Sequence, residues 1–300
     1  NNQAVVLGDR GDYASGVKLH RRALSIREKH FGSDNEWVGE SANNLASQLG
    51  YLGKYEEALA NQERAVQIFR DQLGIDHQRY WWAKLNLGIA YLDMGDSQGA
   101  LPICQDVLQG LQKRYGAEHS EVCYALDAVA SCHFKLGQFE EALSTYTRSL
   151  LIGEKTFGEG SFETASTVGE QGRCLIALGR HEDAVERLNR SLQIWEDYLV
   201  EDNALLCAGL NQLSELHLQR QEYEPALGYA LRSGVLGLRD LGEGHPLLAE
   251  AYLLEGRAQL GLGHENAALA QALRAEGISR RHLQSAMRVL AEERALDYAS

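Results

Sequence analysis

The chain has 300 residues, of which 44% are hydrophobic and 24% are charged, a balance typical of a globular protein with a large core. Its net charge of -13 disfavours binding to phosphate backbones, so we expect no nucleic-acid partner. No apolar run approaches the roughly 20 residues of a membrane-spanning helix, and the five cysteines lack paired spacing, so we expect a cytoplasmic protein with no membrane partner.

The dominant feature is an internal repeat with a period of 42 residues. A turn motif begins at Gly11, Gly53, Gly95, Gly137, Gly179, Gln221 and Gly263. Five positions later a tiny residue follows, at Gly16, Ala58, Ala100, Ala142, Ala184, Ala226 and Ala268. Because only small side chains occupy this column, we expect two helices to touch most closely there.

Each copy of the repeat contains two stretches with helical hydrophobic spacing. In the second copy the pattern predicts helices over residues 38–52 and 55–73, with Gly53 ending the first. A second glycine column follows the second helix, at Gly32, Gly74, Gly116, Gly158 and Gly242. The sequence therefore predicts an all-α chain of stacked antiparallel helical hairpins. Since residues 3–8 match only the end of a first helix, we also expect a piece of a longer protein.

These columns resemble the tetratricopeptide repeat (TPR) family. The family's small residue in the first helix is matched by Ala46, Gly88, Ala130, Gly172, Ser214 and Gly256. The period and the phrases that begin at Asn43, Gly53 and Leu241 are similar to the kinesin-light-chain variety. The resemblance implies an α-solenoid, the TPR superhelix, over residues 1–280. It also implies a scaffold that binds a peptide or protein segment in its inner groove.

Residues 281–300 follow the last repeat. The glycine loop column becomes Leu283-Gln284 there, so we predict that a helix runs past Met287 and Leu290 as a cap or linker. This segment resembles the one that leads from bacterial TPR arrays into a caspase-like CHAT protease domain. The resemblance implies an alternative function, the sensing arm of a protease whose catalytic domain lies outside this chain.

No motif for catalysis, a metal or a cofactor is present. The cysteines fall in columns of small apolar residues and lack the spacing of zinc ligands, so we expect buried thiols. His77, His119 and His245 share a column with Asn35, Ser161 and Asn203, residue types that cap helix N-termini. Phosphate-binding and zinc-protease motifs do not occur. We therefore expect no cofactor and no enzyme activity.

The first helix of each hairpin carries the candidate binding residues. The resemblance places on the inner face Asn43, Tyr51, Trp82, Leu85, Ile89, Asp93, Tyr124, Asp127, Arg173, Asn211 and Arg257. Trp82, Leu85, Ile89 and Tyr124 favour a groove for an apolar or aromatic anchor, although such side chains can also pack against the next helix.

Two further expectations concern the same helices. Asn43 and Asn211 match the family's paired-Asn motif, which implies that they hold a bound backbone. A neighbouring column is expected to pack against the following helix instead, at Leu92, Phe134, Ile176, Leu218 and Leu260.

Overall fold

The structure, a computed structural model, describes residues 13–198 and 206–280. The chain divides into two compact units, unit 1 up to Glu159 and unit 2 from Gly160. Unit 1 contains α2 (Tyr13–Phe31), α3 (Glu36–Tyr51), α4 (Tyr55–Leu73), α5 (Gln78–Asp93), α6 (Ser97–Tyr115), α7 (Ser120–Lys135) and α8 (Phe139–Thr156). Unit 2 contains α9 (Phe162–Ala177), α10 (His181–Tyr198), α11 (Cys207–Gln219), α12 (Tyr223–Asp240), α13 (Pro246–Gly261) and a last helix at 265–280.

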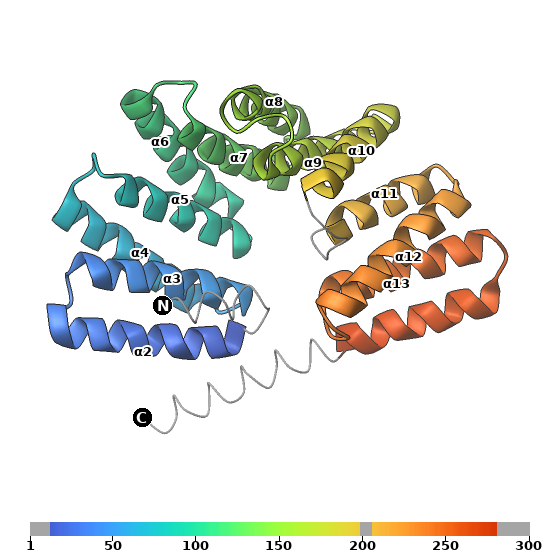
Figure 1. Cartoon of the computed structure of the whole chain (residues 1–300), viewed down its shortest axis with the longest axis horizontal. Coiled ribbons are helices and arrows are strands. Elements are labelled where there is room, and N and C mark those ends of the chain that lie inside the picture. The colour runs from blue at the N-terminus through green and yellow to red at the C-terminus, as the bar shows by residue number, and fades with distance from the viewer. Residues whose placement is uncertain (1–12, 199–205, 281–300) are drawn as a thin grey trace. The chain divides into compact units, whose positions relative to one another are not determined.

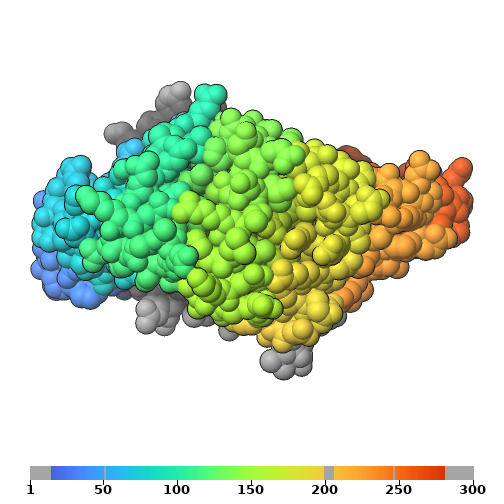
Figure 2. Space-filling model, turned by 90° about the horizontal axis from the view of Figure 1, so that it is seen from above, coloured from blue at the N-terminus to red at the C-terminus, as the bar shows by residue number. Residues whose placement is uncertain are grey.

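The predicted hairpin architecture is confirmed in both units. Within each unit, consecutive helices pack side by side and alternate in direction, and the described residues contain no strand (Figure 1). The second copy of the repeat, expected at 38–52 and 55–73, forms α3 and α4 within two residues of those bounds. In the space-filling view the surface of unit 1 passes from blue to green in chain order, as expected when each helix packs on the next (Figure 2).

The small-residue columns are the places of closest approach within a hairpin. Ala100, Ala142, Ala184 and Ala226 are completely buried. A Cβ added to Gly256 of α13 would lie 3.1 Å from the carbonyl oxygen of Ala268, and one added to Gly172 would lie 2.7 Å from Leu188. The backbones are therefore too close for larger side chains, which confirms the close contact expected at the column of Ala100, Ala142, Ala184 and Ala226.

Glycine ends the helices by adopting a left-handed backbone. The described glycines of the turn column and of the second glycine column have φ between 71° and 98°, where a side chain costs conformational energy. Gln221, which replaces glycine in the turn after α11, keeps the same conformation with φ of 59°. It is the one non-glycine residue with positive φ in the described part of the chain.

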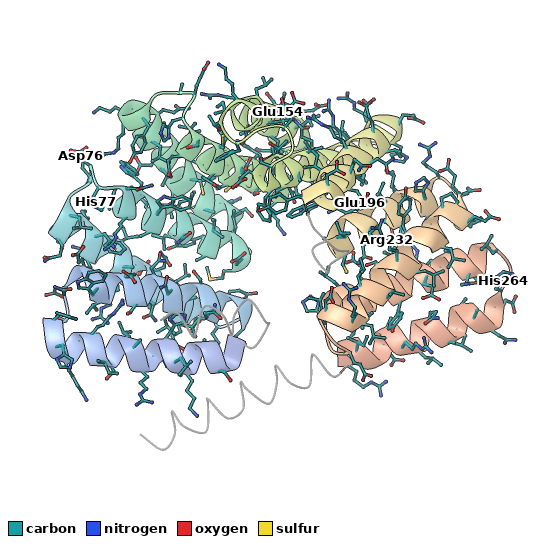
Figure 3. All side chains as sticks on the ribbon, viewed as in Figure 1. Asp76, His77, Glu154, Glu196, Arg232 and His264 are labelled. Carbon is teal, nitrogen blue, oxygen red and sulfur yellow. The ribbon has the colours of Figure 1, made fainter. Side chains whose placement is uncertain are left out.

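The expected capping column is also confirmed. Asn35 Oδ1 accepts a hydrogen bond from the Trp37 amide at 3.0 Å, and Ser161 Oγ accepts one from Thr164 at 3.1 Å. His77, which lies in the loop before α5 beside Asp76, uses Nδ1 to accept from Arg79 at 3.2 Å (Figure 3). His119 and His245 do the same at the start of α7 and α13. The remaining capping candidate, Asn203, lies outside the described residues.

Several expectations concern parts of the chain that are not described. These are the partial first helix at 3–8 and the tail at 281–300, including Leu283, Met287 and Leu290. The suggested link to a caspase-like protease depends on that tail and stays a prediction. Among the described helices, none is both long and apolar enough to cross a membrane.

Replacing Ala142 by arginine tests the closest contact. Ala142 is 0% exposed where α8 meets α7, so Ala142→Arg forces a long side chain and its charge into a packed interface. We expect the free energy of unfolding to fall by about 3 kcal/mol or more in thermal melts followed by circular dichroism. Ser144→Arg, at an exposed position of the same helix, should change it by less than about 0.5 kcal/mol. Superimposable melting curves for Ala142→Arg and wild type would contradict this packing.

The left-handed turn after α11 gives a second test. Gln221→Gly should raise the free energy of unfolding by about 0.5 to 1 kcal/mol, because glycine adopts φ of 59° without the clash of a Cβ. The control Gln219→Gly changes the last residue of α11, where glycine weakens the helix, so it should lower stability. Chemical denaturation measures both, and a loss of stability in Gln221→Gly would show that the turn is not strained.

Candidate functional site

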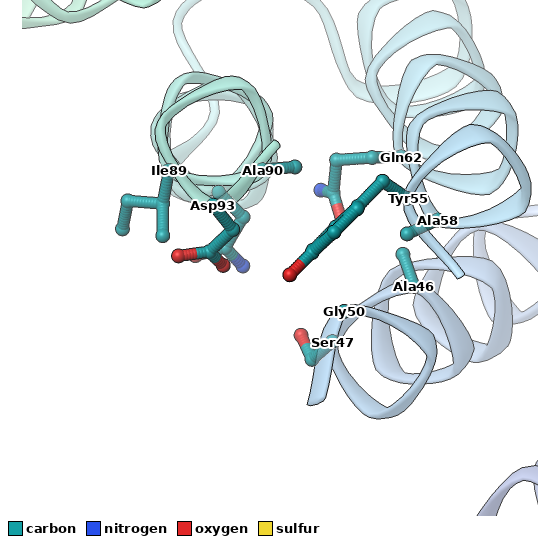
Figure 4. Close-up of a pocket in the computed structure, with 10 residues that line it drawn as sticks. Ala46, Ser47, Gly50, Tyr55, Ala58, Gln62, Ile89, Ala90 and Asp93 are labelled. Carbon is teal, nitrogen blue, oxygen red and sulfur yellow. The ribbon is translucent and has the colours of Figure 1, made fainter. Parts of the chain in front are cut away.

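A pocket of about 320 Å³ opens between α3, α4 and α5 of unit 1. We name it the Gly50 pocket. It is lined by Ala46, Ser47 and Gly50 from α3, by Tyr55, Ala58 and Gln62 from α4, and by Asn86, Ile89, Ala90 and Asp93 from α5. Figure 4 shows these side chains around the open space, with the Tyr55 hydroxyl and the Asp93 carboxylate both directed into it. Two first helices and the second helix between them therefore build the site together.

A hydrogen-bonded group of amides forms the inner end of the pocket. Gln62 is 1% exposed, and its Nε2 donates to Asn43 Oδ1 at 2.8 Å and to the Ala83 carbonyl at 2.9 Å. Asn86 Nδ2 donates to the same Asn43 oxygen at 3.0 Å. These bonds connect α3, α4 and α5, and they fix Asn86 at the pocket wall.

The outer part of the pocket is amphipathic. Ile89 is 39% exposed and lines the pocket together with Tyr55 and Ala90. Asp93 lies near the mouth, where partial burial raises the pKa of its carboxyl while the charge of Lys135 on α7 opposes the rise. The pocket thus offers an apolar wall, amide groups at its inner end and one carboxylate.

The pocket exists because Gly50 lacks a side chain. The same column holds glycine at Gly8 in the first copy, and large apolar residues in the later ones, at Leu92, Phe134, Ile176, Leu218 and Leu260. Of these, Leu218 is 8% exposed and fills the equivalent place in unit 2. There it packs with four other buried apolar residues against Tyr223 and Leu227, namely Ala226, Ala230, Leu254 and Ala258. The positions that form a pocket between α3, α4 and α5 are therefore filled by apolar side chains between α11, α12 and α13.

The predicted aromatic residues of unit 1 adjoin the pocket but pack against the core. Trp82 and Tyr124 are half-buried, and their ring centroids lie 5.1 Å apart. Tyr124 also meets Phe157 edge to face at 5.8 Å. Leu85 is 3% exposed inside the core cluster of α5, α6 and α7, which corrects its assignment to a groove surface. Of the four apolar candidates, only Ile89 presents an exposed side chain.

The polar candidates divide between the two units. Asn43 is part of the amide group, and Asp127 is half-buried on α7, where its charge raises the pKa of the Cys123 thiol. The side chain of Tyr51 lies outside the described residues. In unit 2, Arg173 pairs with Glu170 on its own helix at 2.9 Å, and Arg257 of α13 pairs with Glu215 of α11.

Asn211 also departs from its expected role. It is 1% exposed, and its Nδ2 donates to the Leu247 carbonyl at 3.2 Å and to Glu250 at 3.1 Å. Its amide thus joins α11 to α13, and the expectation that it faces a bound backbone is corrected. Leu260 also differs from its expected role. It was expected to pack against the following helix, but its side chain is 60% exposed.

Three polar residues of the pocket were not predicted from the faces of the first helices, namely Tyr55, Gln62 and Asn86. Two of them lie on the second helix, and their contribution depends on how α4 lies between α3 and α5. Asn86 had a signal in the sequence, since it occupies the second position of the paired-Asn motif in its copy. Gly50 had one as well, since its column holds glycine here and at Gly8 but large apolar residues in the later copies.

The cysteines are buried as expected, and all five are free thiols. Burial raises the pKa of Cys123 to about 11 and that of Cys174 to about 12. The hydrogen bond between Cys104 and Cys132, together with burial, raises the pKa of Cys104. The described residues contain no group of three or more histidine, cysteine or acidic side chains that could hold a metal ion.

Comparison with known proteins relates this helical repeat to a known family. The sequence pattern of the tetratricopeptide repeat matches residues 1–71, 40–113, 81–155, 121–196 and 163–233. No curated protein matches the chain by sequence.

Among solved structures, the chain is similar to the nearly identical TPR-like repeats of a Podosopora anserina kinesin light chain, with 22% identity and a TM-score of 0.54 over 67% of this chain and 95% of that one. BtubC from P. vanneervenii gives 16% identity and a TM-score of 0.62 over 77% and 90%. The Rap conjugation gene regulator of the plasmid pLS20, in complex with the Phr* peptide, gives 12% identity and a TM-score of 0.67 over 94% and 73%. These likenesses show the fold.

Thiol labelling tests the assignment of the cysteines to the core. Since all five thiols are buried, and burial raises the pKa of Cys123 and Cys174, we expect DTNB to label the folded chain very slowly. Unfolding in guanidinium should release all five thiols at once. Fast labelling of even one cysteine in the folded protein would show an accessible, activated thiol.

Proposed function

Because the chain belongs to the tetratricopeptide repeat family, we propose that it is a protein-interaction scaffold without catalytic activity that anchors a peptide segment in the Gly50 pocket. The observation that carries the proposal is the pocket at Gly50, a position where the third and later copies of the repeat place a large apolar residue. A packed helical core does not keep an opening of this size without cost, since close packing contributes to its stability.

The lining of the pocket supports a side-chain anchor. Concave sites that combine apolar walls with a few fixed polar groups are typical of ligand recognition. Ile89 and Tyr55 supply the apolar contact, and Asn86 supplies an amide that is oriented by its bond to Asn43. An anchor residue of a peptide could fill the pocket while its backbone lies across α3 and α5.

The rest of the same face supports an extended partner. Trp82 and Tyr124 lie one to two turns away from the pocket along α5 and on α7, and both retain some exposure. Half-buried aromatic rings beside a pocket are typical of interface positions. The Rap regulator whose fold this chain resembles was solved with a peptide bound, which supports a peptide as the class of partner.

Filling the pocket from within the chain tests the proposal. Peptides are selected from a random display library on the 300-residue chain, and their affinities are measured by calorimetry. Gly50→Leu, which restores the residue type of Leu92 and Leu218, should weaken binding by about tenfold or more, or about 1.4 kcal/mol.

The same variant should keep its stability. A Cβ at Gly50 meets only Asp93 Oδ2, at 3.8 Å, and glycine within a helix costs about 1 kcal/mol relative to other residues. The melting temperature should therefore stay equal or rise. Gly228→Leu, at an exposed glycine of α12 with open space around it, is the matched control and should bind as wild type does. Unchanged affinity in Gly50→Leu, or a library that yields no binder, would overturn the proposal.

A further inference from the structure

Of the described residues that line the Gly50 pocket, Asp93 alone is charged. Among the described residues no ion pair or hydrogen bond engages its side chain, although Lys135 acts on it through its charge. Burial raises the pKa of this carboxyl more than Lys135 lowers it. Asp93 is exposed at the pocket and has no direct partner among the described residues, so its carboxylate is open to a bound cation.

The matching first helices of unit 2 carry their charges at other positions. There Glu215 of α11 and Arg257 of α13 form an ion pair, with two hydrogen bonds. The corresponding residues in unit 1 are Ser47 and Ile89, and the counterpart of Asp93 in unit 2 is Gly261. The carboxylate of unit 2 thus has an arginine bound to it, whereas Asp93 has only the charge of Lys135 acting from a distance.

The remaining lining is suited to a long side chain that is apolar along its stem and charged at its end. Ile89, Ala90 and Tyr55 line the pocket, and Figure 4 shows Asp93 between the side chains of Ile89 and Tyr55. Lysine and arginine bury their methylene groups against such surfaces while the charged end meets a carboxylate. An aromatic or aliphatic anchor would fill the space but would leave Asp93 without a partner.

We propose that the Gly50 pocket takes a lysine or arginine side chain of the bound peptide, with the cation at the Asp93 carboxylate and the stem against Ile89 and Tyr55. The inference rests on the proposed function and specifies its partner as a peptide with a basic anchor residue. The net charge of -13 adds a long-range attraction for such a peptide.

Parallel library selections test the anchor chemistry. The wild-type chain, Asp93→Asn and Asp93→Lys each select peptides from the same random display library. Wild type should enrich one lysine or arginine position, Asp93→Asn should lose that enrichment, and Asp93→Lys should favour aspartate or glutamate. Enrichment of the same sequences by wild type and Asp93→Lys would overturn the inference.

A double-mutant cycle then measures the contact itself. A lysine-containing peptide from the wild-type selection, and its version with lysine replaced by methionine, are titrated into wild type and Asp93→Asn. Asp93→Asn should weaken the lysine peptide about five- to tenfold and leave the methionine peptide unchanged. Glu140→Gln, an exposed carboxylate of α8, removes the same charge outside the pocket and should change neither affinity more than about twofold.

The two proposals fail in different ways. Peptides that lose affinity in Gly50→Leu but not in Asp93→Asn would overturn the basic anchor and leave the peptide-binding pocket standing. Peptides that lose affinity in neither variant would overturn both. Equal melting temperatures for wild type and Asp93→Asn exclude loss of folding as the cause of any change.

Discussion

The backbones of the two helices in each hairpin approach so closely that only alanine, glycine or serine fits between them. Ser214 illustrates the contact, because its hydroxyl reaches the Ala226 carbonyl of the partner helix at 2.8 Å. A contact of this kind fixes both the distance and the rotation of the two helices. Every hairpin that keeps it presents its remaining columns in the same directions. The regular spacing of caps, turns and core positions depends on that constraint.

Because this helix contact recurs in the copies of the repeat, the side chains at a few matching positions decide whether a copy contains a pocket or a filled core. Leu218 turns one set of positions into a sealed cluster with Ala230 and Leu254. Gly50, with Gln62 and Asn86 at the matching places, turns the same set into a pocket with amides at its inner end. A pocket can therefore arise in such an array when one copy lacks a core-filling side chain, while the backbone keeps the same path.

The sequence alone predicted the features that depend on one helix and its ends. The capping role of His77 and His119 followed from sharing a column with asparagine and serine, and the burial of the thiols followed from their neighbours in register. The candidate site was predicted less well. Asn211 and Leu85 lie on the expected face, but a helix packs against each from a direction that periodicity within one helix does not reveal. Pocket residues such as Gln62 required knowing how three helices meet.

The histidine caps differ from the others in the hydrogen-bonding groups that they carry. An imidazole accepts a backbone hydrogen bond only through an unprotonated nitrogen, whereas Asn35 and Ser161 accept through a side-chain oxygen. His77, His119 and His245 each accept at Nδ1, so the hydrogen of the neutral ring lies on Nε2. The starts of α5, α7 and α13 therefore carry a ring N–H donor that the start of α9, capped by a serine hydroxyl, does not. Caps that are equivalent for the helices thus give the copies of the repeat different hydrogen-bonding groups in their loops.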